Sequence, residues 1–222
     1  MRRLVTVLTA LLLATAAAAG AGDDIKWKRS KKLDFVPINS NTEGISDNYE
    51  KTTSKYSLKW TPFGHHKIGF IQVVLHNWEV YVSDLKAQAK AGKIDANTLP
   101  AAVAKGIDVY PRYFTFYVSI NTFAPLYSFL VEGGPWTIYL VDPVSGKPVA
   151  PVSIEPIGEP LIGVFEVGSV YGGKGMLISA ATQTTYKVIF AYANASSYCA
   201  SLKLVLTCDL CRRGFEWRFV EE

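Results

Sequence analysis

Three cysteines are the residues whose spacing in this sequence most directly suggests chemistry. Cys208 and Cys211 form a C-x-x-C motif at a point where the flanking pattern predicts a hairpin turn. In an oxidising compartment such a pair can close a local disulfide, although the very short loop limits how much that bond would stabilise the fold. Cys199 precedes the same region and is a third candidate for disulfide or redox chemistry.

Leucines at alternate positions in residues 201–207 predict a strand between Cys199 and Cys208. Extended at about 3.3 Å per residue, that strand would hold these two cysteines roughly 30 Å apart. A disulfide needs Cα atoms within about 7 Å of each other, so Cys199 and Cys208 cannot bond in this arrangement. A disulfide between Cys199 and Cys211 is the alternative if the end of the chain folds differently.

A thiol redox role would need a helix N-terminus to stabilise the thiolate of Cys208 or Cys211. The aromatic residues after the motif alternate with charged ones, which predicts a strand there and argues against that role. A structural zinc site would need four ligands. Beyond the cysteines the chain offers only His65, His66 and His76, without the spacing of a zinc finger. We therefore expect no metal and no cofactor.

The clearest strand in the chain runs over residues 110–121. Apolar side chains at every second position from Phe114 to Ile120 share one face, which is the pattern of a half-buried antiparallel strand. The other face carries Tyr113 and Tyr117 among hydroxyl-bearing residues. Such a surface suits binding to sugars or to protein partners, unless it packs against another layer of the protein. Tyr113 and Tyr117 are therefore candidate binding residues.

The sequence contains no complete catalytic motif. Residues 168–175 satisfy the glycine and lysine spacing of a phosphate-binding loop, but Gly175 replaces the Ser or Thr that would hold magnesium. Three glutamates, Glu155, Glu159 and Glu166, could serve a glycosidase only if two of them converged. The sequence thus leaves enzymatic activity open and favours a protein that is not an enzyme.

The composition and the N-terminus indicate a packed, exported protein. The 222 residues are 49% hydrophobic and 13% aromatic, and only 19% are charged, which excludes a disordered chain, a coiled coil and a collagen-like protein. A basic start is followed by an apolar run over residues 4–19 and then by small residues, which predicts a signal peptide at residues 1–21. A transmembrane helix needs roughly 20 apolar residues, so we expect no transmembrane segment in the mature chain.

The basic charge of the chain belongs partly to this signal. The formal net charge is +4, and Arg2 and Arg3 contribute two of those charges. The densest basic cluster, residues 26–32, is interrupted by a tryptophan and flanked by aspartates, so we expect no nucleic-acid partner. Residues 22–57 are polar and contain few aliphatic side chains, which predicts a poorly ordered N-terminal arm with at most an edge strand at residues 33–38.

Short alternating segments separated by Gly- and Pro-rich turns predict about nine strands beyond the arm. Residues 175–181 and 185–193 are expected as two of them. An Ala- and Lys-rich segment at residues 83–106 predicts two short helices, the first capped by Ser83. We expect residues 58–222 to form an all-β domain, an antiparallel β-sandwich with this short helical insertion, and a small β-barrel is the alternative.

Part of this domain resembles secreted immunoglobulin-like modules. Within residues 113–151 a strand ends in Asn, a second strand begins at Trp136, and an Asp-x-x-x-Gly turn begins at Asp142. The resemblance covers about 40 residues and carries no chemical motif. It implies an immunoglobulin-like fold and leaves the function open, because sandwiches host many functions.

These features favour an exported, non-enzymatic binding or structural module of a bacterial cell envelope, located in the periplasm or outside the cell. Its expected partner is a protein or a polysaccharide. One alternative is a periplasmic or extracellular enzyme, either a thiol redox protein or a carbohydrate-active one. Another is a subunit of an envelope assembly that pairs through an exposed strand. The sequence leaves the oligomeric state open.

Overall fold

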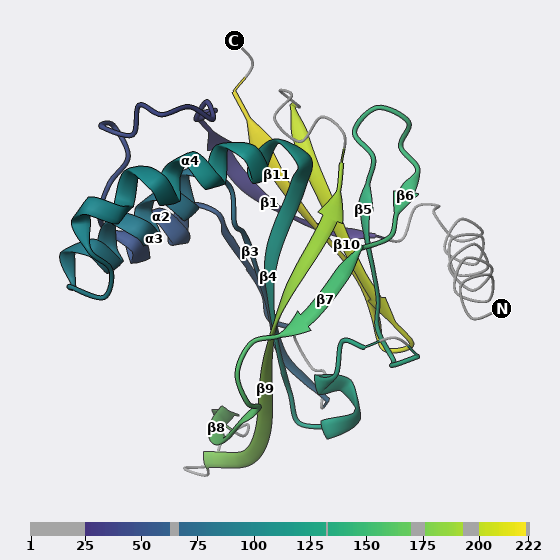
Figure 1. The fold of residues 1–222 in the computed structure, drawn as a ribbon. Helices are drawn as coiled ribbons and strands as arrows, with labels where there is room; N and C mark the ends of the chain where they lie inside the picture. The colour runs from purple at the N-terminus through teal and green to yellow at the C-terminus, as the bar shows by residue number, and fades with distance from the viewer. Residues whose placement is uncertain (1–24, 63–66, 132, 170–175, 193–199, 221–222) are drawn as a thin grey trace, which may run out of the picture.

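The computed structural model describes residues 25–62, 67–131, 133–169, 176–192 and 200–220. Its strands form two sheets, A and B (Figure 1). In sheet A the strand order is β1-β11-β10-β5-β6, and in sheet B it is β2-β3-β4-β9-β7, with β8 also pairing β9. The strands of sheet A are β1 (Lys26–Leu33), β5 (Thr137–Val141), β6 (Pro148–Val149), β10 (Ser201–Cys208) and β11 (Cys211–Phe219). Those of sheet B are β2 (Ser57–Trp60), β3 (Ile68–Leu75), β4 (Tyr113–Thr122), β7 (Ser153–Pro156), β8 (Leu161–Ser169) and β9 (Met176–Ala191).

The core lies between the two sheets and is built from alternate residues of their central strands. Phe116 of β4 and Trp217 of β11 are fully buried, and their ring centroids are 5.3 Å apart. Trp217 Nε1 donates to the backbone oxygen of Tyr56 at 2.7 Å, which satisfies the buried indole. The protein is therefore mainly β and sandwich-like, as the alternating pattern predicted. The alternative of a small barrel is wrong, because neither sheet closes on itself within the described residues.

In the described part of the chain, three α-helices gather at one end of the sheets (Figure 1). They are α2 (Tyr49–Lys55), α3 (Trp78–Lys90) and α4 (Leu99–Val109). The 3-10 helices are η1 (Ala96–Thr98), η2 (Tyr110–Arg112) and η3 (Pro125–Ser128).

The helical insertion begins earlier than the sequence predicted. Asn77 caps α3, because its side chain accepts a hydrogen bond from the Val80 amide at 3.1 Å. Ser83, the predicted cap, lies inside α3, where its buried hydroxyl donates to Thr52 of α2 at 3.0 Å. The first helix of the insertion is thus fixed to a helix from the N-terminal segment.

That N-terminal segment is not the poorly ordered arm that its composition predicted, because it contains β1 and α2. β1 pairs in parallel with β11 at the edge of sheet A. Its lysines are exposed, as is common for edge strands, which use charge to avoid unwanted pairing. The ring of Trp27 packs over Gly214 of β11, and the Ser30 hydroxyl accepts from the Arg218 amide at 2.9 Å.

β9 is one continuous strand of 16 residues, where the sequence predicted two strands divided at Thr182 and Gln183. These two residues pair with β4 on one side and with β8 on the other. Their polar side chains do not interrupt the strand, because the ladder is made by backbone groups. Beyond them, β8 and β9 continue as a hairpin that projects past the rest of sheet B (Figure 1).

Several sequence predictions fall outside the described residues. They concern the signal peptide at residues 1–21, the glycine-rich residues 170–175, the histidines His65 and His66, and Cys199. In the part of the chain that the structure does describe, no helix combines the length and the apolar character needed to cross a membrane.

Candidate functional site

A groove of about 600 Å³ lies on the outer face of sheet B, beside helices α3 and α4. β4 contributes Tyr113, Thr115 and Tyr117, which share one face of that strand as the alternation predicted. The other lining residues with rings or charges are His76 after β3, Tyr81 and Asp84 on α3, Lys105 on α4, Tyr110 of η2 and Lys187 on β9. We call this site the tyrosine groove, after Tyr81, Tyr110, Tyr113 and Tyr117.

His76 is the centre of the ring contacts in the tyrosine groove. Its ring centroid lies 4.7 Å from that of Tyr117, 6.1 Å from that of Tyr110 and 6.4 Å from that of Tyr81. Its Nδ1 lies 2.7 Å from the Tyr110 hydroxyl oxygen. Only 7% of His76 is exposed, and this burial lowers its pKa to about 4. The ring is therefore neutral at pH 7.

Burial raises the pKa of three tyrosines of the groove, and the nearby carboxylate of Asp84 raises it further. They are Tyr81, Tyr110 and Tyr117. Their hydroxyls stay protonated at neutral pH and can donate as well as accept hydrogen bonds. Tyr81 already donates to the backbone oxygen of Ala102 at 2.9 Å.

One carboxylate and two ammonium groups also line the groove. Gln88 Nε2 donates to Asp84 Oδ2 at 2.8 Å, which orients the carboxylate on α3. Lys187 is the register partner of Tyr117 across β4 and β9, so an ammonium group and a phenol are neighbours on the groove floor. Among the described residues, neither Lys187 nor Lys105 forms an ion pair. The groove can therefore offer these charges, together with the phenols, to a bound molecule.

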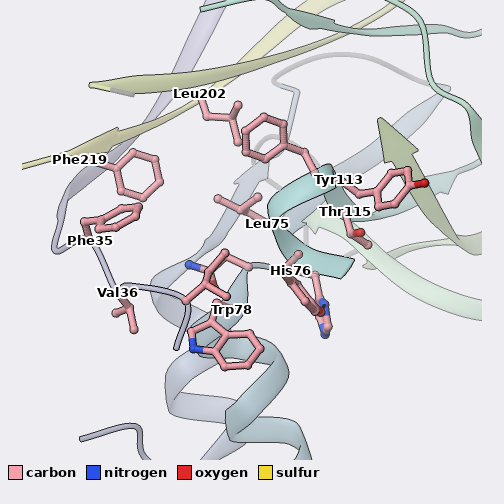
Figure 2. Close-up of a pocket in the computed structure, with 13 residues that line it drawn as sticks. Phe35, Val36, Leu75, His76, Trp78, Tyr113, Thr115, Leu202 and Phe219 are labelled. Atoms are coloured by element: carbon pink, nitrogen blue, oxygen red, sulfur yellow. Dashed lines mark hydrogen bonds between the residues drawn. The ribbon is translucent and has the colours of Figure 1, made fainter. Parts of the chain in front are cut away.

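A smaller apolar cavity of about 70 Å³ adjoins the tyrosine groove (Figure 2). The two spaces share four lining residues, His76, Tyr110, Tyr113 and Thr115. In Figure 2, Phe35 and Phe219 lie together on one side of the cavity, and the ring of Tyr113 points away from them. Tyr113 is 38% exposed, so its ring is accessible from solvent.

The structure places both predicted binding residues, Tyr113 and Tyr117, on the groove. Tyr117 is half-buried against His76. Part of its surface is therefore used for packing within the protein, which was the alternative to a binding role. Sequence reasoning missed Tyr81 and Asp84 as partners of these residues. The capping signal at Asn77 could have placed them on one helix, but nothing in the sequence shows that this helix lies beside β4.

The C-x-x-C motif forms the turn between β10 and β11, as the sequence predicted, and Cys208 is the register partner of Cys211. The two sulfurs are 3.8 Å apart and belong to free thiols. A disulfide bond is about 2 Å long, so the local disulfide stays a prediction. Cys199 lies outside the described residues. Within those residues, no three or more His, Cys, Asp or Glu side chains are grouped as metal ligands.

Comparison of the chain with protein-family models, with curated proteins and with solved structures finds no match. The function is therefore inferred from the tyrosine groove and from the hairpin of β10 and β11 with Cys208 and Cys211 at its turn, which we call the cysteine hairpin.

Proposed function

We propose that the protein is an exported, non-enzymatic binding module of a bacterial cell envelope, and that its tyrosine groove holds a saccharide chain. The observation that carries this proposal is the convergence of four tyrosines on one open groove that also holds a carboxylate and two ammonium groups. Export is supported by the signal-peptide pattern of residues 1–21. An immunoglobulin-like sandwich, which is a common scaffold for binding surfaces, is part of the same proposal.

The chemistry of the groove suits a sugar ring. A pyranose offers a face of C–H groups that can pack on an aromatic ring, and hydroxyls that need donors and acceptors when water is removed. Tyr113 supplies an accessible ring, and Tyr117 and Thr115 supply hydroxyls beside it on the same strand face. Asp84 can accept from sugar hydroxyls, and Lys187 can donate to them.

Binding without hydrolysis is supported by the groups that the groove contains. Glycoside hydrolysis commonly uses two carboxyl groups that face each other across the scissile bond. Among the described lining residues Asp84 is the one carboxylate. Glu155 is the register partner of Lys187, but it is exposed and its carboxylate accepts from the Ser153 hydroxyl at 2.6 Å.

The test is retention of the purified protein on insoluble peptidoglycan, chitin and cellulose. We expect retention on at least one of them, and Tyr113→Ala and Tyr117→Ala should each weaken the apparent affinity about tenfold, because each removes an aromatic contact. Phe129→Ala is the matched control. Phe129 is 44% exposed but lies after η3, beyond the other end of β4. The proposal would be contradicted if the wild type bound none of the three materials, or if the Phe129 variant lost as much affinity as the tyrosine variants.

A subunit of an envelope assembly is the second candidate, and the projecting β8–β9 hairpin favours it. Leu161 and Ile162 at its base are 66% and 80% exposed. A two-stranded hairpin is also marginally stable without further packing. In size-exclusion chromatography with light scattering, an assembly role predicts a defined oligomer that Ile162→Asp dissociates. A monomer in both samples would eliminate self-assembly.

A further inference from the structure

The cysteine hairpin lies at the end of β10 and the start of β11, where Asp209 and Leu210 alone form the turn. Because Cys208 and Cys211 are register partners, their side chains lie on the same face of the hairpin. The two sulfurs are 3.8 Å apart. About 2 Å of further approach would form a disulfide bond, a movement that side-chain rotation can supply without a change of register.

The sulfur of Cys208 lies beside polar groups of its own turn. The Cys211 sulfur lies 3.8 Å from it, within the range of a thiol hydrogen bond that either group can donate, and the backbone amides of Leu210 and Cys211 are its nearest neighbours in the turn. These donors stabilise negative charge on Cys208 and hold its pKa below the ordinary thiol value, with the Cys211 thiol contributing most. The same contact, together with burial, raises the pKa of Cys211. A β-turn can thus lower the pKa of a thiol in the way that a helix N-terminus does.

The turn is both anchored and accessible. The Tyr127 hydroxyl donates to Asp209 Oδ2 at 2.8 Å, and Trp136 Nε1 donates to the backbone oxygen of Tyr127 at 2.7 Å. Both cysteines are only partly buried, and Asp209 is exposed. Cys208 and Cys211 also pack against the core, so an external disulfide would approach the Cys208 sulfur from the solvent side of the turn, which keeps its shape.

We propose that Cys208 and Cys211 form a reversible thiol–disulfide pair, with Cys208 as the attacking thiol and Cys211 as the resolving thiol. The Cys208 thiolate attacks one sulfur of an external disulfide, forms a mixed disulfide and releases the first external thiolate. Cys211 then loses its proton and attacks the Cys208 sulfur, which closes the hairpin disulfide and releases the second thiolate. Two protein thiols are oxidised, one external disulfide is reduced, and the two released thiolates take up the two protons. This activity is independent of saccharide binding.

The experiment uses the full mature chain with Cys199→Ser, so that only the hairpin thiols react. Cys208→Ser and Cys211→Ser are made in this background and mixed with oxidised glutathione at pH 7, and the adducts are followed by intact mass. In Cys211→Ser a serine hydroxyl takes the place of the thiol as a donor, and the backbone amides of the turn still face Cys208. This variant should therefore form the mixed disulfide about tenfold faster than Cys208→Ser. The hairpin with both cysteines should pass to an internal disulfide that dithiothreitol reopens.

A denatured sample shows whether the rate difference depends on the folded turn or only on the local sequence. In urea the turn is lost, so the two single variants should react at similar rates. The proposal would be overturned if the two folded variants reacted at equal rates, or if their rate difference persisted in urea. It would also be overturned if the hairpin with both cysteines stayed reduced in oxidised glutathione. Circular dichroism of each variant without urea checks that it has the same secondary structure as the parent protein.

Discussion

The Tyr110 hydroxyl oxygen lies 2.7 Å from Nδ1 of His76 and joins η2 to the junction between β3 and α3. The backbone N–H of His76 also donates to the Thr115 carbonyl of β4 at 2.9 Å. His76 is thus bonded through both its ring and its main chain. It ties the helical layer to sheet B at the point where the tyrosine groove begins.

Acidification from pH 6.5 to pH 4 is expected to destabilise the protein through His76. Burial lowers its folded-state pKa from 6.5 to about 4, so the unfolded chain binds more protons in this window. The contribution of the neutral ring is complete above the unfolded pKa and is lost as the pH falls through the window, by about 3 kcal/mol. Urea unfolding across these pH values measures this loss. His76→Phe should make the free energy of unfolding less dependent on pH, and an unchanged slope would show that His76 is not the responsible group.

Gly106→Ala is expected to separate α3 from α4. A Cβ at Gly106 would lie 2.4 Å from Tyr81 Cε1 and 2.8 Å from Trp78 Cζ3, closer than carbon atoms approach. We expect a loss of about 1–3 kcal/mol of stability, as for other overpacked sites. Thermal unfolding measures it, with Gly44→Ala as the control because a Cβ there would meet nothing within 4 Å. Similar melting temperatures for the two variants would contradict the close packing of these helices.

Gly214→Ala is expected to detach β1 from sheet A. A Cβ at this position would lie 2.3 Å from Trp27 Cε3, so the indole that covers β11 must move. The exposed basic residues of β1 then become sites for trypsin, and cleavage between residues 26 and 32 should be faster than in the wild type. Adding Trp27→Ala removes the clash, so the double variant should lose less stability than the two single effects combined. Full additivity would mean that Trp27 and Gly214 are not in contact.

Asp84→Asn is expected to weaken saccharide binding about tenfold, because a hydrogen bond to a charged group is worth more than one to a neutral amide. The stability of the protein should change little, since Asp84 lies at a groove open to solvent. Asp108→Asn is the matched control, because Asp108 is exposed on α4 and does not line the groove. Isothermal titration of both variants with the polysaccharide fragment that binds the wild type decides the matter. Equal affinities for the two variants would remove Asp84 from the site.

The strands with strict alternation could be predicted from the sequence. In β4 and β10 every second side chain enters the core, so the period of two is visible in the residue types. β1 could not be recognised, because an edge strand with exposed lysines has the composition of a solvated segment. The sequence predicted a break between two strands at Thr182 and Gln183. That prediction was wrong because a strand paired on both sides tolerates polar side chains.

The candidate site could be predicted only in part. Tyr113 and Tyr117 share a strand face, and this is a local property of the sequence. Asp84 and Lys187 reach the same groove from α3 and from β9, which is a consequence of packing between distant segments. The pKa of Cys208 is lowered by the Cys211 thiol and by backbone amides of the turn, whereas the sequence pattern was tested only for a helix N-terminus.

Saccharide binding at the tyrosine groove is tested most directly by nuclear magnetic resonance of protein with isotope-labelled tyrosine rings. The protein is titrated separately with chitotetraose, cellotetraose and soluble peptidoglycan fragments. We predict saturable shifts of the Tyr113 and Tyr117 ring signals with at least one of them, and no shift of Tyr127, which lies beside the cysteine hairpin. Ring signals of Tyr113 and Tyr117 that stay unmoved by all three ligands would contradict the account.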